Sequence, residues 1–207
     1  MNDREKPASD FRADYQRYLA TMIGIHGPLR ARLAAATEFG FLAIAVFRLG
    51  RWSRLIRPRW LAFPIKLIYR LFDFLVQILF GISISSNCRI GPGFYIGHFG
   101  GIVLHCTMGA GCSIGQGVTI GSRGAGRSDG YPVLGDRVYV GAGAMVIGSV
   151  GIGDDVIVGA NTVVVTDVPD GYRVVSASAR LLPPSMATPG RAPTKSSWSS
   201  GRSRSVR

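Results

Sequence analysis

The chain has 207 residues, of which 47% are hydrophobic, so it is long enough for one repeat domain and a smaller element. Its formal net charge of +12 lies at the two ends, because residues 1–80 carry thirteen basic and six acidic side chains, the tail from residue 184 carries five basic ones, and residues 81–183 are balanced. No recognised nucleic-acid-binding motif accompanies this charge, so nucleic acid is not an expected partner.

The first 80 residues are predicted to be mostly helical. Residues 1–13 are polar without periodicity and are expected to be disordered, whereas residues 14–80 have a helical pattern broken at Gly27-Pro28, Gly50, Pro58 and Pro64. No segment reaches the ~18 uncharged apolar residues of a membrane span. The first twenty residues are polar and mixed in charge, unlike a secretory signal, so a cytoplasmic location is expected.

The segment 48–80 combines cations with aromatic residues. Between Arg48 and Arg70 there are seven basic residues and no acidic one, interleaved with Trp52, Trp60, Phe63 and Tyr69. This pattern fits a helix in the headgroup region, which would make residues 48–80 a peripheral contact at the inner face of the membrane. It fits equally a helical cap whose apolar face packs against the rest of the protein.

An aliphatic residue recurs at every sixth position through the middle of the chain, and a glycine follows most of these positions. Neither a period-two strand nor an α-helix sustains such a spacing. The pattern predicts a mainly β protein, a left-handed parallel β-helix over residues 81–183, with three hexapeptides in each of roughly four coils. It also predicts that Ile84, Ile102 and Ile120 stack on one edge. The repeated positions are Ile84, Ile90, Ile96, Ile102, Met108, Ile114, Ile120, Leu134, Val140, Val146, Ile152, Val158 and Val164.

Two segments depart from this rhythm. Residues 121–133 form a polar, glycine-rich loop in place of one corner. Residues 184–207 are too poor in apolar side chains to fold alone and are expected to be a disordered basic tail. The three cysteines lack C-x-x-C spacing and occupy inward positions, so buried reduced thiols are expected and no metal site.

Among three histidines, His98 is the candidate for chemistry. It lies two residues after Ile96, where side chains project outward, and three glycines (Gly97, Gly100 and Gly101) surround it. An exposed neutral imidazole can take a proton from an alcohol. A surface histidine alone, however, more often has no such role.

Several segments carry a specific resemblance. They are Arg89 to Gly93, His98 with Gly101-Ile102-Val103, Gln116 to Gly121, Val140 to Ala144, Ile157 to Asn161 and Val163 to Pro169. With them, residues 81–180 resemble the catalytic domain of the serine acetyltransferases and of related hexapeptide-repeat O-acetyltransferases encoded with polysaccharide biosynthesis. The resemblance implies acetyl-CoA as co-substrate, no metal, and trimers or dimers of trimers that bind acetyl-CoA between neighbouring subunits.

The resemblance also implies roles for individual residues. His98 occupies the place of the general base that deprotonates the acceptor hydroxyl. Tyr131 takes the place of a second histidine in the loop, which makes it a candidate either to donate a hydrogen bond to the oxyanion or the acceptor or to act only as a lid. The groove for acetyl-CoA would be lined by Ser122, Ala142 and Ala160, with Arg180 as a partner for phosphate.

Departures from the family pattern bear on the acceptor. Serine acetyltransferases have aspartates at the positions of Ser83 and Gly97, one to orient the base and one for the serine substrate. Their absence favours a sugar hydroxyl in exopolysaccharide or capsule synthesis. The alternative enzyme is a serine O-acetyltransferase of cysteine biosynthesis, and the alternative of another class is a non-catalytic, membrane-associated β-helix scaffold.

Overall fold

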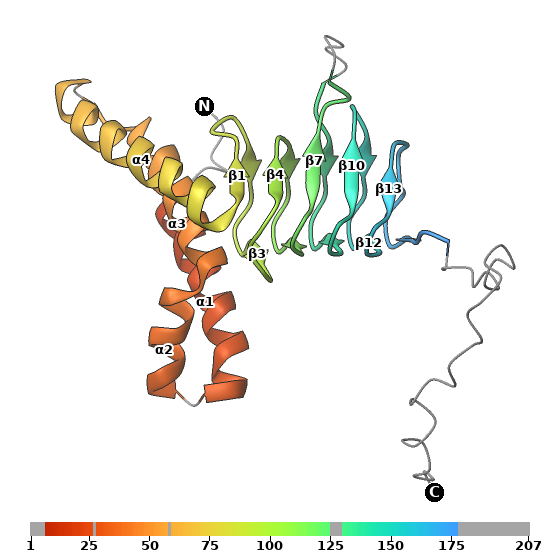
Figure 1. Cartoon of the computed structure of the whole chain (residues 1–207), viewed down its shortest axis with the longest axis horizontal. Coiled ribbons are helices and arrows are strands. Elements are labelled where there is room, and N and C mark those ends of the chain that lie inside the picture. The colour runs from red at the N-terminus through yellow and green to blue at the C-terminus, as the bar shows by residue number, and fades with distance from the viewer. Residues whose placement is uncertain (1–6, 27, 58, 125–129, 178–207) are drawn as a thin grey trace, which may run out of the picture. The chain divides into compact units, whose positions relative to one another are not determined.

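The computed structural model describes residues 7–26, 28–57, 59–124 and 130–177, in which four helices precede fourteen short strands (Figure 1). The helices are α1 (Pro7–His26), α2 (Pro28–Thr37), α3 (Phe39–Ser53) and α4 (Arg59–Phe80). The strands are β1 (Ile82–Ile84), β2 (Arg89–Ile90), β3 (Tyr95–Ile96), β4 (Ile102–Leu104), β5 (Thr107–Met108), β6 (Ser113–Ile114), β7 (Thr119–Gly121), β8 (Val133–Leu134), β9 (Tyr139–Val140), β10 (Met145–Ile147), β11 (Gly151–Ile152), β12 (Ile157–Val158), β13 (Val163–Val164) and β14 (Arg173–Val174).

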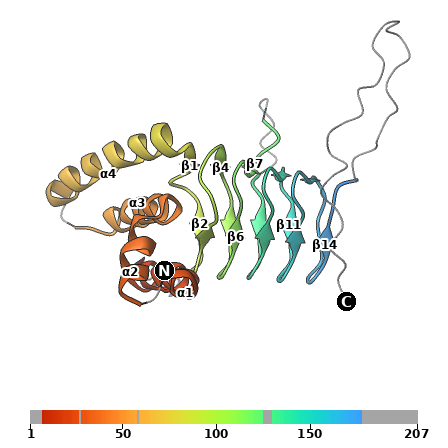
Figure 2. The ribbon, with the colours of Figure 1, turned by 60° about the horizontal axis from the view of Figure 1, so that its bottom comes forward.

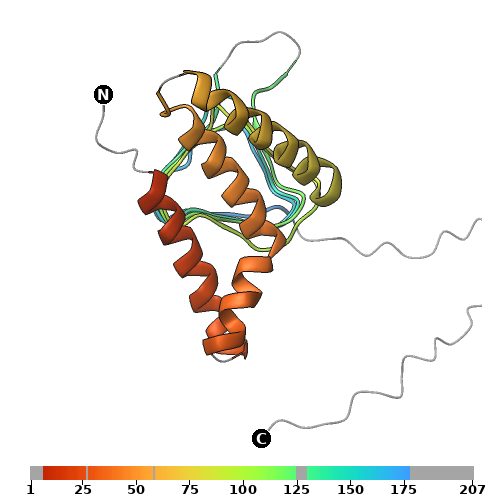
Figure 3. The same ribbon diagram turned by 90° about the vertical axis from the view of Figure 1, so that its left-hand side faces the viewer.

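The strands wind into a left-handed parallel β-helix, which confirms the predicted fold class. Every third strand joins the same sheet, so sheet A contains β1, β4, β7, β10 and β13, sheet B contains β2, β5, β8 and β11, and sheet C contains β3, β6, β9, β12 and β14. Figure 2 shows strands of successive coils side by side, and Figure 3 shows the coils superimposed along three sides. We call the turn from sheet C to sheet A the C–A corner and that from sheet A to sheet B the A–B corner.

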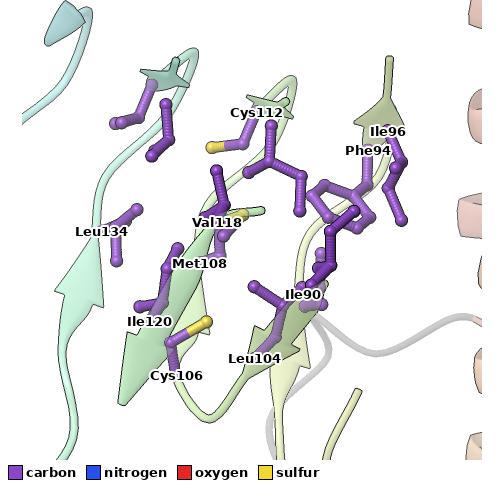
Figure 4. Packing of buried hydrophobic residues seen from close by; sticks show 14 of the residues in the cluster. Ile90, Phe94, Ile96, Leu104, Cys106, Met108, Cys112, Val118, Ile120 and Leu134 are labelled. Carbon is purple, nitrogen blue, oxygen red and sulfur yellow. The ribbon is translucent and has the colours of Figure 1, made fainter. Parts of the chain in front are cut away.

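The interior of the β-helix is filled by the aliphatic residues of the hexapeptide pattern. Ile114, Ile120, Val140 and Val158 are at most 1% exposed. Figure 4 shows Leu104, Met108, Ile120 and Leu134 among the side chains directed into this core. The three cysteines are also buried there as free thiols, as predicted.

The register of the first two coils differs from the prediction. Ile84 pairs with Leu104, and Leu104 pairs with Ile120. Ile102 instead pairs with Ile82, and both are buried. The predicted stack of Ile84, Ile102 and Ile120 is therefore wrong, because the corner before β4 is longer than a hexapeptide allows.

Side chains of α1 and α3 cover the edge of the first coil. Asp14 accepts a hydrogen bond from the Phe94 N–H (2.8 Å) and pairs with Arg48 (2.9 Å). Arg48 in turn donates to the carbonyl oxygens of Ile90 (2.6 Å) and Gly91 (2.7 Å). Burial raises the pKa of Asp14, against the opposing effect of Arg48. Because β2 and β3 are the edge strands of sheets B and C, these contacts satisfy backbone groups in and beside them that would otherwise be open to another chain.

Helix α1 begins at Pro7, so the prediction of disorder is wrong for residues 7–13. Asp10 forms an ion pair with Arg48 (3.5 Å), and the ring of Phe11 packs against that of Phe41 (5.4 Å between centroids). These partners lie far along the chain, which is why local polarity suggested disorder. The predicted tail, residues 184–207, lies outside the described residues.

Two of the predicted helix breaks are also wrong, because α3 continues through Gly50 and α4 contains Pro64. Gly50 serves close packing, since a Cβ atom there would overlap the Tyr69 ring, with Cζ at 2.6 Å and Cε2 closer still. Among the described helices, none alone is long and apolar enough to cross a membrane, although Leu29–Thr37 and Phe39–Ser53, bent by 65°, meet the length and composition criteria as a pair.

Candidate active site

The C–A corner repeats the same hydrogen bonds in successive coils. The N–H of Gly97 donates to Ile114 O (2.9 Å), and the N–H of Gly115 donates to Val140 O (2.9 Å). The residue that ends the corner has a positive φ in each coil. The values are 67° at Gly101, 70° at Gly117, 69° at Gly143 and 55° at Asn161. A left-handed residue therefore closes each corner, which is why glycine or asparagine stands there.

These equivalences show that the first corner has two extra residues. One residue, Gln116, separates Gly115 from Gly117, whereas three separate Gly97 from Gly101. The N–H of Gly143 donates to Gln116 O (2.8 Å), and the N–H of Gly117 donates to Gly100 O (2.8 Å), so Gly100 is the equivalent of Gln116. The inserted residues are His98 and Phe99.

The two inserted side chains have different surroundings. The ring of Phe99 contacts those of Phe39 (4.9 Å between centroids) and Phe80 (6.5 Å), where the first residue of α3 lies beside the last residue of α4. His98 is exposed and makes no hydrogen bond or ion pair with the described residues. Phe99 thus anchors the insertion and leaves the imidazole available to a substrate.

Two of the predicted groove residues share this edge with His98. Ala142 and Ala160 occupy the C–A corners that follow β9 and β12, where the Asn161 N–H donates to Ala142 O (2.9 Å). Their positions correspond to Gly100 and Gln116 in the preceding coils. The edge below His98 therefore carries short side chains, with Gln116 as the long one, and leaves room beside the backbone for an extended ligand.

The other two predicted residues of the loop lie on a different edge. Ser122 and Tyr131 flank the loop at the A–B corner, after β7 and before β8. Sheet A separates that corner from the C–A corner, so within one chain neither residue shares an edge with His98. Arg180 lies outside the described residues.

Sequence reasoning missed His105, which contacts the predicted Tyr131. The two rings stack with centroids 5.7 Å apart and planes 26° apart. His105 directly follows β4, and its N–H donates to Ile120 O (2.7 Å). The A–B corner between β4 and β5 consists of His105 and Cys106 alone, whereas the A–B corner of the next coil, between β7 and β8, runs from Ser122 to Pro132. The short corner therefore lies against the base of the long one. The unequal lengths of these two corners are the feature of the sequence that could have indicated the contact between His105 and Tyr131.

Gly97 and Ser83, the two positions at which the resemblance predicts aspartate, have different surroundings. Gly97 has no atom closer than 3.7 Å to a Cβ atom built on it, and no positive φ. Ser83 is half-buried in β1 and pairs with Val103. Among residues 97–101 of this corner there is no carboxylate.

A parallel β-helix of hexapeptide repeats with an exposed histidine inserted at one corner defines a protein of the hexapeptide-repeat acyltransferase class. No protein-family model matches the chain. A serine acetyltransferase of Synechococcus elongatus is 35% identical over 177 residues, 84% of this chain and 67% of the relative. One of Helicobacter pylori is 41% identical over 117 residues, 56% of this chain and 68% of the relative. The chain belongs to the serine acetyltransferase family.

A solved structure agrees with this assignment. Soybean serine acetyltransferase complexed with serine has a TM-score of 0.66 and 27% identity, covering 84% of this chain and 70% of the soybean chain. The chain thus spans about two thirds of the length of these relatives. The predicted O-acetyltransferase class is confirmed. The predicted polysaccharide branch finds no support, since the relatives are named serine acetyltransferases.

Proposed function

We propose that the chain is an acetyl-CoA-dependent serine O-acetyltransferase in which His98 is the general base. The insertion that presents His98 at the C–A corner is the observation that carries the proposal. The acceptor follows from the relatives, one of which was solved with serine bound. The comparisons therefore favour the alternative prediction, L-serine, over the sugar hydroxyl that the missing aspartates first suggested.

The reaction needs one proton carrier. The neutral imidazole of His98 removes the proton from the serine hydroxyl as its oxygen attacks the thioester carbonyl carbon of acetyl-CoA. The C–O bond forms, a tetrahedral oxyanion results, and the C–S bond then breaks. The imidazolium returns its proton to the departing sulfur, so O-acetylserine and CoA leave with His98 restored.

The edge below His98 suits the pantetheine arm of acetyl-CoA. Ala142 and Ala160 add little bulk there, and the arm needs close approach to the backbone more than charged contacts. Ser122, Tyr131 and His105 lie on the A–B edge of the same chain. In our proposal the C–A edge of one protomer faces the A–B edge of a neighbour, which forms a homotrimer with three equivalent sites. Tyr131 then donates a hydrogen bond to the oxyanion or to the acceptor.

A sugar hydroxyl is the second candidate, and one observation favours it. An amino-acid substrate carries an ammonium group, and the corner residues 97–101 supply no carboxylate for it. Gly97, with open space beside its Cα atom, leaves room for a bulkier neutral acceptor. This candidate differs from the first in the acceptor alone and not in the role of His98.

The test is thiol release from acetyl-CoA by the purified chain and by His98→Ala, with L-serine and with a panel of nucleotide sugars and oligosaccharides. Serine-dependent release that the substitution abolishes is the expected result. Release with sugars but not with serine would transfer the proposal to the second candidate. Silence with every acceptor, together with no binding of acetyl-CoA in calorimetry, would leave the chain a non-catalytic scaffold.

A further inference from the structure

Helix α4 has two apolar faces, of which the fold uses one. Ala62 and Val76 are buried, and Ile65, Tyr69 and Phe80 are half-buried, at intervals of three to seven residues. This face packs against α3 and the start of the β-helix, where the Phe80 ring lies 4.7 Å from that of Phe39. The predicted helical cap is thus present, but it accounts for half of the helix.

The opposite face is an exposed apolar stripe. Its six residues follow one another at intervals of three or four, which places them along one side of an α-helix. Their exposed fractions run from 57% to 75%. The helix has 22 residues, so at 1.5 Å per residue the stripe is about 30 Å long. The stripe consists of Trp60, Phe63, Leu67, Leu71, Phe74 and Ile78.

Cations border this stripe along one side. Lys66 and Arg70 are exposed and lie one turn apart, at the edge between the stripe and the packed face. Arg54 and Arg57, just before the helix, are exposed as well. The single acidic residue of α4, Asp73, lies toward the packed face and accepts a hydrogen bond from Gln77 (2.9 Å). The border of the stripe is therefore positive along this side.

We propose that α4 binds the surface of an anionic phospholipid bilayer, with the stripe among the acyl chains and Lys66 and Arg70 at the level of the phosphates. Charge distinguishes this occupant from a second copy of the chain. An antiparallel two-fold contact along the stripe would bring the same cations to one side, and residues 81–183 are formally neutral, so they offer no net acidic partner. Anionic headgroups complement the cations, and bilayer interfaces favour tryptophan and phenylalanine beside basic residues.

The test is co-sedimentation of the full chain with vesicles of phosphatidylglycerol and phosphatidylcholine, compared with phosphatidylcholine alone. We expect at least a tenfold preference for the anionic vesicles. Leu67→Glu with Leu71→Glu should lower binding at least tenfold, and Lys66→Glu with Arg70→Glu should remove the preference. Leu29→Glu with Leu33→Glu, at exposed leucines of α2, is the matched control and should bind like the wild type.

A second readout locates the contact. Lipids brominated in their acyl chains should quench tryptophan fluorescence in the wild type, and Trp60→Phe should remove most of the quenching. The proposal is overturned if the wild type does not sediment, or if the Leu67 and Leu71 variant sediments like the wild type. It is also overturned if that variant changes the oligomeric mass in light scattering while the wild type ignores vesicles, because the stripe would then be an interface between copies.

Discussion

The hydroxyl of Tyr18 in α1 binds both backbone groups of Ile96, donating to its carbonyl oxygen and accepting from its N–H, each at 2.9 Å. Tyr18 is 1% exposed, and its burial raises the pKa of the hydroxyl, which keeps its proton. Ile96 stands two residues before His98. A residue of the first helix therefore holds the strand from which the candidate base projects.

Tyr18→Phe should weaken both the fold and the reaction. The change leaves the N–H and carbonyl of Ile96 without partners in a buried place, a loss of about 1–3 kcal/mol. Urea denaturation should show the loss, and kcat/KM for acetyl transfer should fall because the His98 corner is less well held. Tyr15→Phe is the control, since Tyr15 makes a single exposed bond to Arg32 O at 3.4 Å. Equal effects of the two substitutions would contradict the role of Tyr18.

His98→Ala should slow acetyl transfer by a factor of about 10² to 10⁴, the usual contribution of a positioned general base. Binding of acetyl-CoA should persist, because the small residues of the edge are unchanged. His105→Ala removes the other histidine of the β-helix, the one that stacks on Tyr131. Rates of acetyl transfer measured by thiol release, together with acetyl-CoA affinities from calorimetry, distinguish the effect of His98→Ala from that of His105→Ala. A His98→Ala enzyme as fast as the wild type would rule out the mechanism.

Gly97→Asp should raise kcat/KM for L-serine. The position has space for a side chain, and a carboxylate beside the corner gives the substrate ammonium a partner. One charge-assisted hydrogen bond is worth about 1.5–3 kcal/mol, so a gain of roughly tenfold or more is expected. Gly97→Asn has nearly the same size without the charge and should not reproduce it. A lower value with aspartate than with asparagine would count against L-serine as the acceptor.

Gly141→Ala should destabilise the β-helix, because a Cβ atom there would meet Ala160 N at 2.6 Å and Gly159 C at 2.9 Å. Overpacking of this kind costs about 1–3 kcal/mol. Gly97→Ala is the matched change at the equivalent place of the first coil, where the nearest atoms are 3.7 Å away. Thermal unfolding should show a lower Tm for Gly141→Ala and little change for Gly97→Ala. An equal fall in Tm for the two variants would contradict the argument that the next coil leaves no room for a side chain at position 141.

Aspartates at the corners between sheets B and C connect the coils. The Asp136 N–H donates to the carboxylate of Asp154 (2.7 Å), and the Asp154 N–H donates to that of Asp170 (2.8 Å). Asp154→Ala leaves the first of these donors unpaired and should cost about 1–3 kcal/mol in denaturant unfolding. Asp155→Asn removes the charge of an exposed pair with Arg137 at a left-handed position that asparagine tolerates, and should change stability little. Asp154→Asn keeps an acceptor oxygen and should retain most of the unfolding free energy that Asp154→Ala loses.

The sequence was sufficient for the fold class because the hexapeptide rhythm directly reflects the period of the coils. It was insufficient for the register of the first two coils. Ile96 to Leu104 is two residues longer than a hexapeptide, and Leu104 to Met108 is two shorter, so the two departures cancel and the rhythm resumes. Ile102 meanwhile stands six residues after Ile96 and is buried too, at a different inward position.

Part of the candidate site could be predicted from the sequence and part could not. His98, Ala142 and Ala160 could be placed on one edge from spacing and resemblance, since that edge repeats. The pairing of His105 with Tyr131 could not be predicted, because it depends on which corner is shortened beside the long loop. The start of α1 was missed for a related reason, because Asp10 and Asp14 find their cation 34 or more residues away, at Arg48.

The insertion of His98 and Phe99 sets the proposed general base apart from the repeating framework. Later coils close the same corner without these residues, so the repeating backbone does not require them, although their removal takes away the contacts of Phe99 with Phe39 and Phe80. Deleting both should leave a coil like its successors, folded and inert. In the proposed mechanism the reactive group is carried by a dipeptide that the repeat does not require, so substitution of His98 should change activity with little effect on folding.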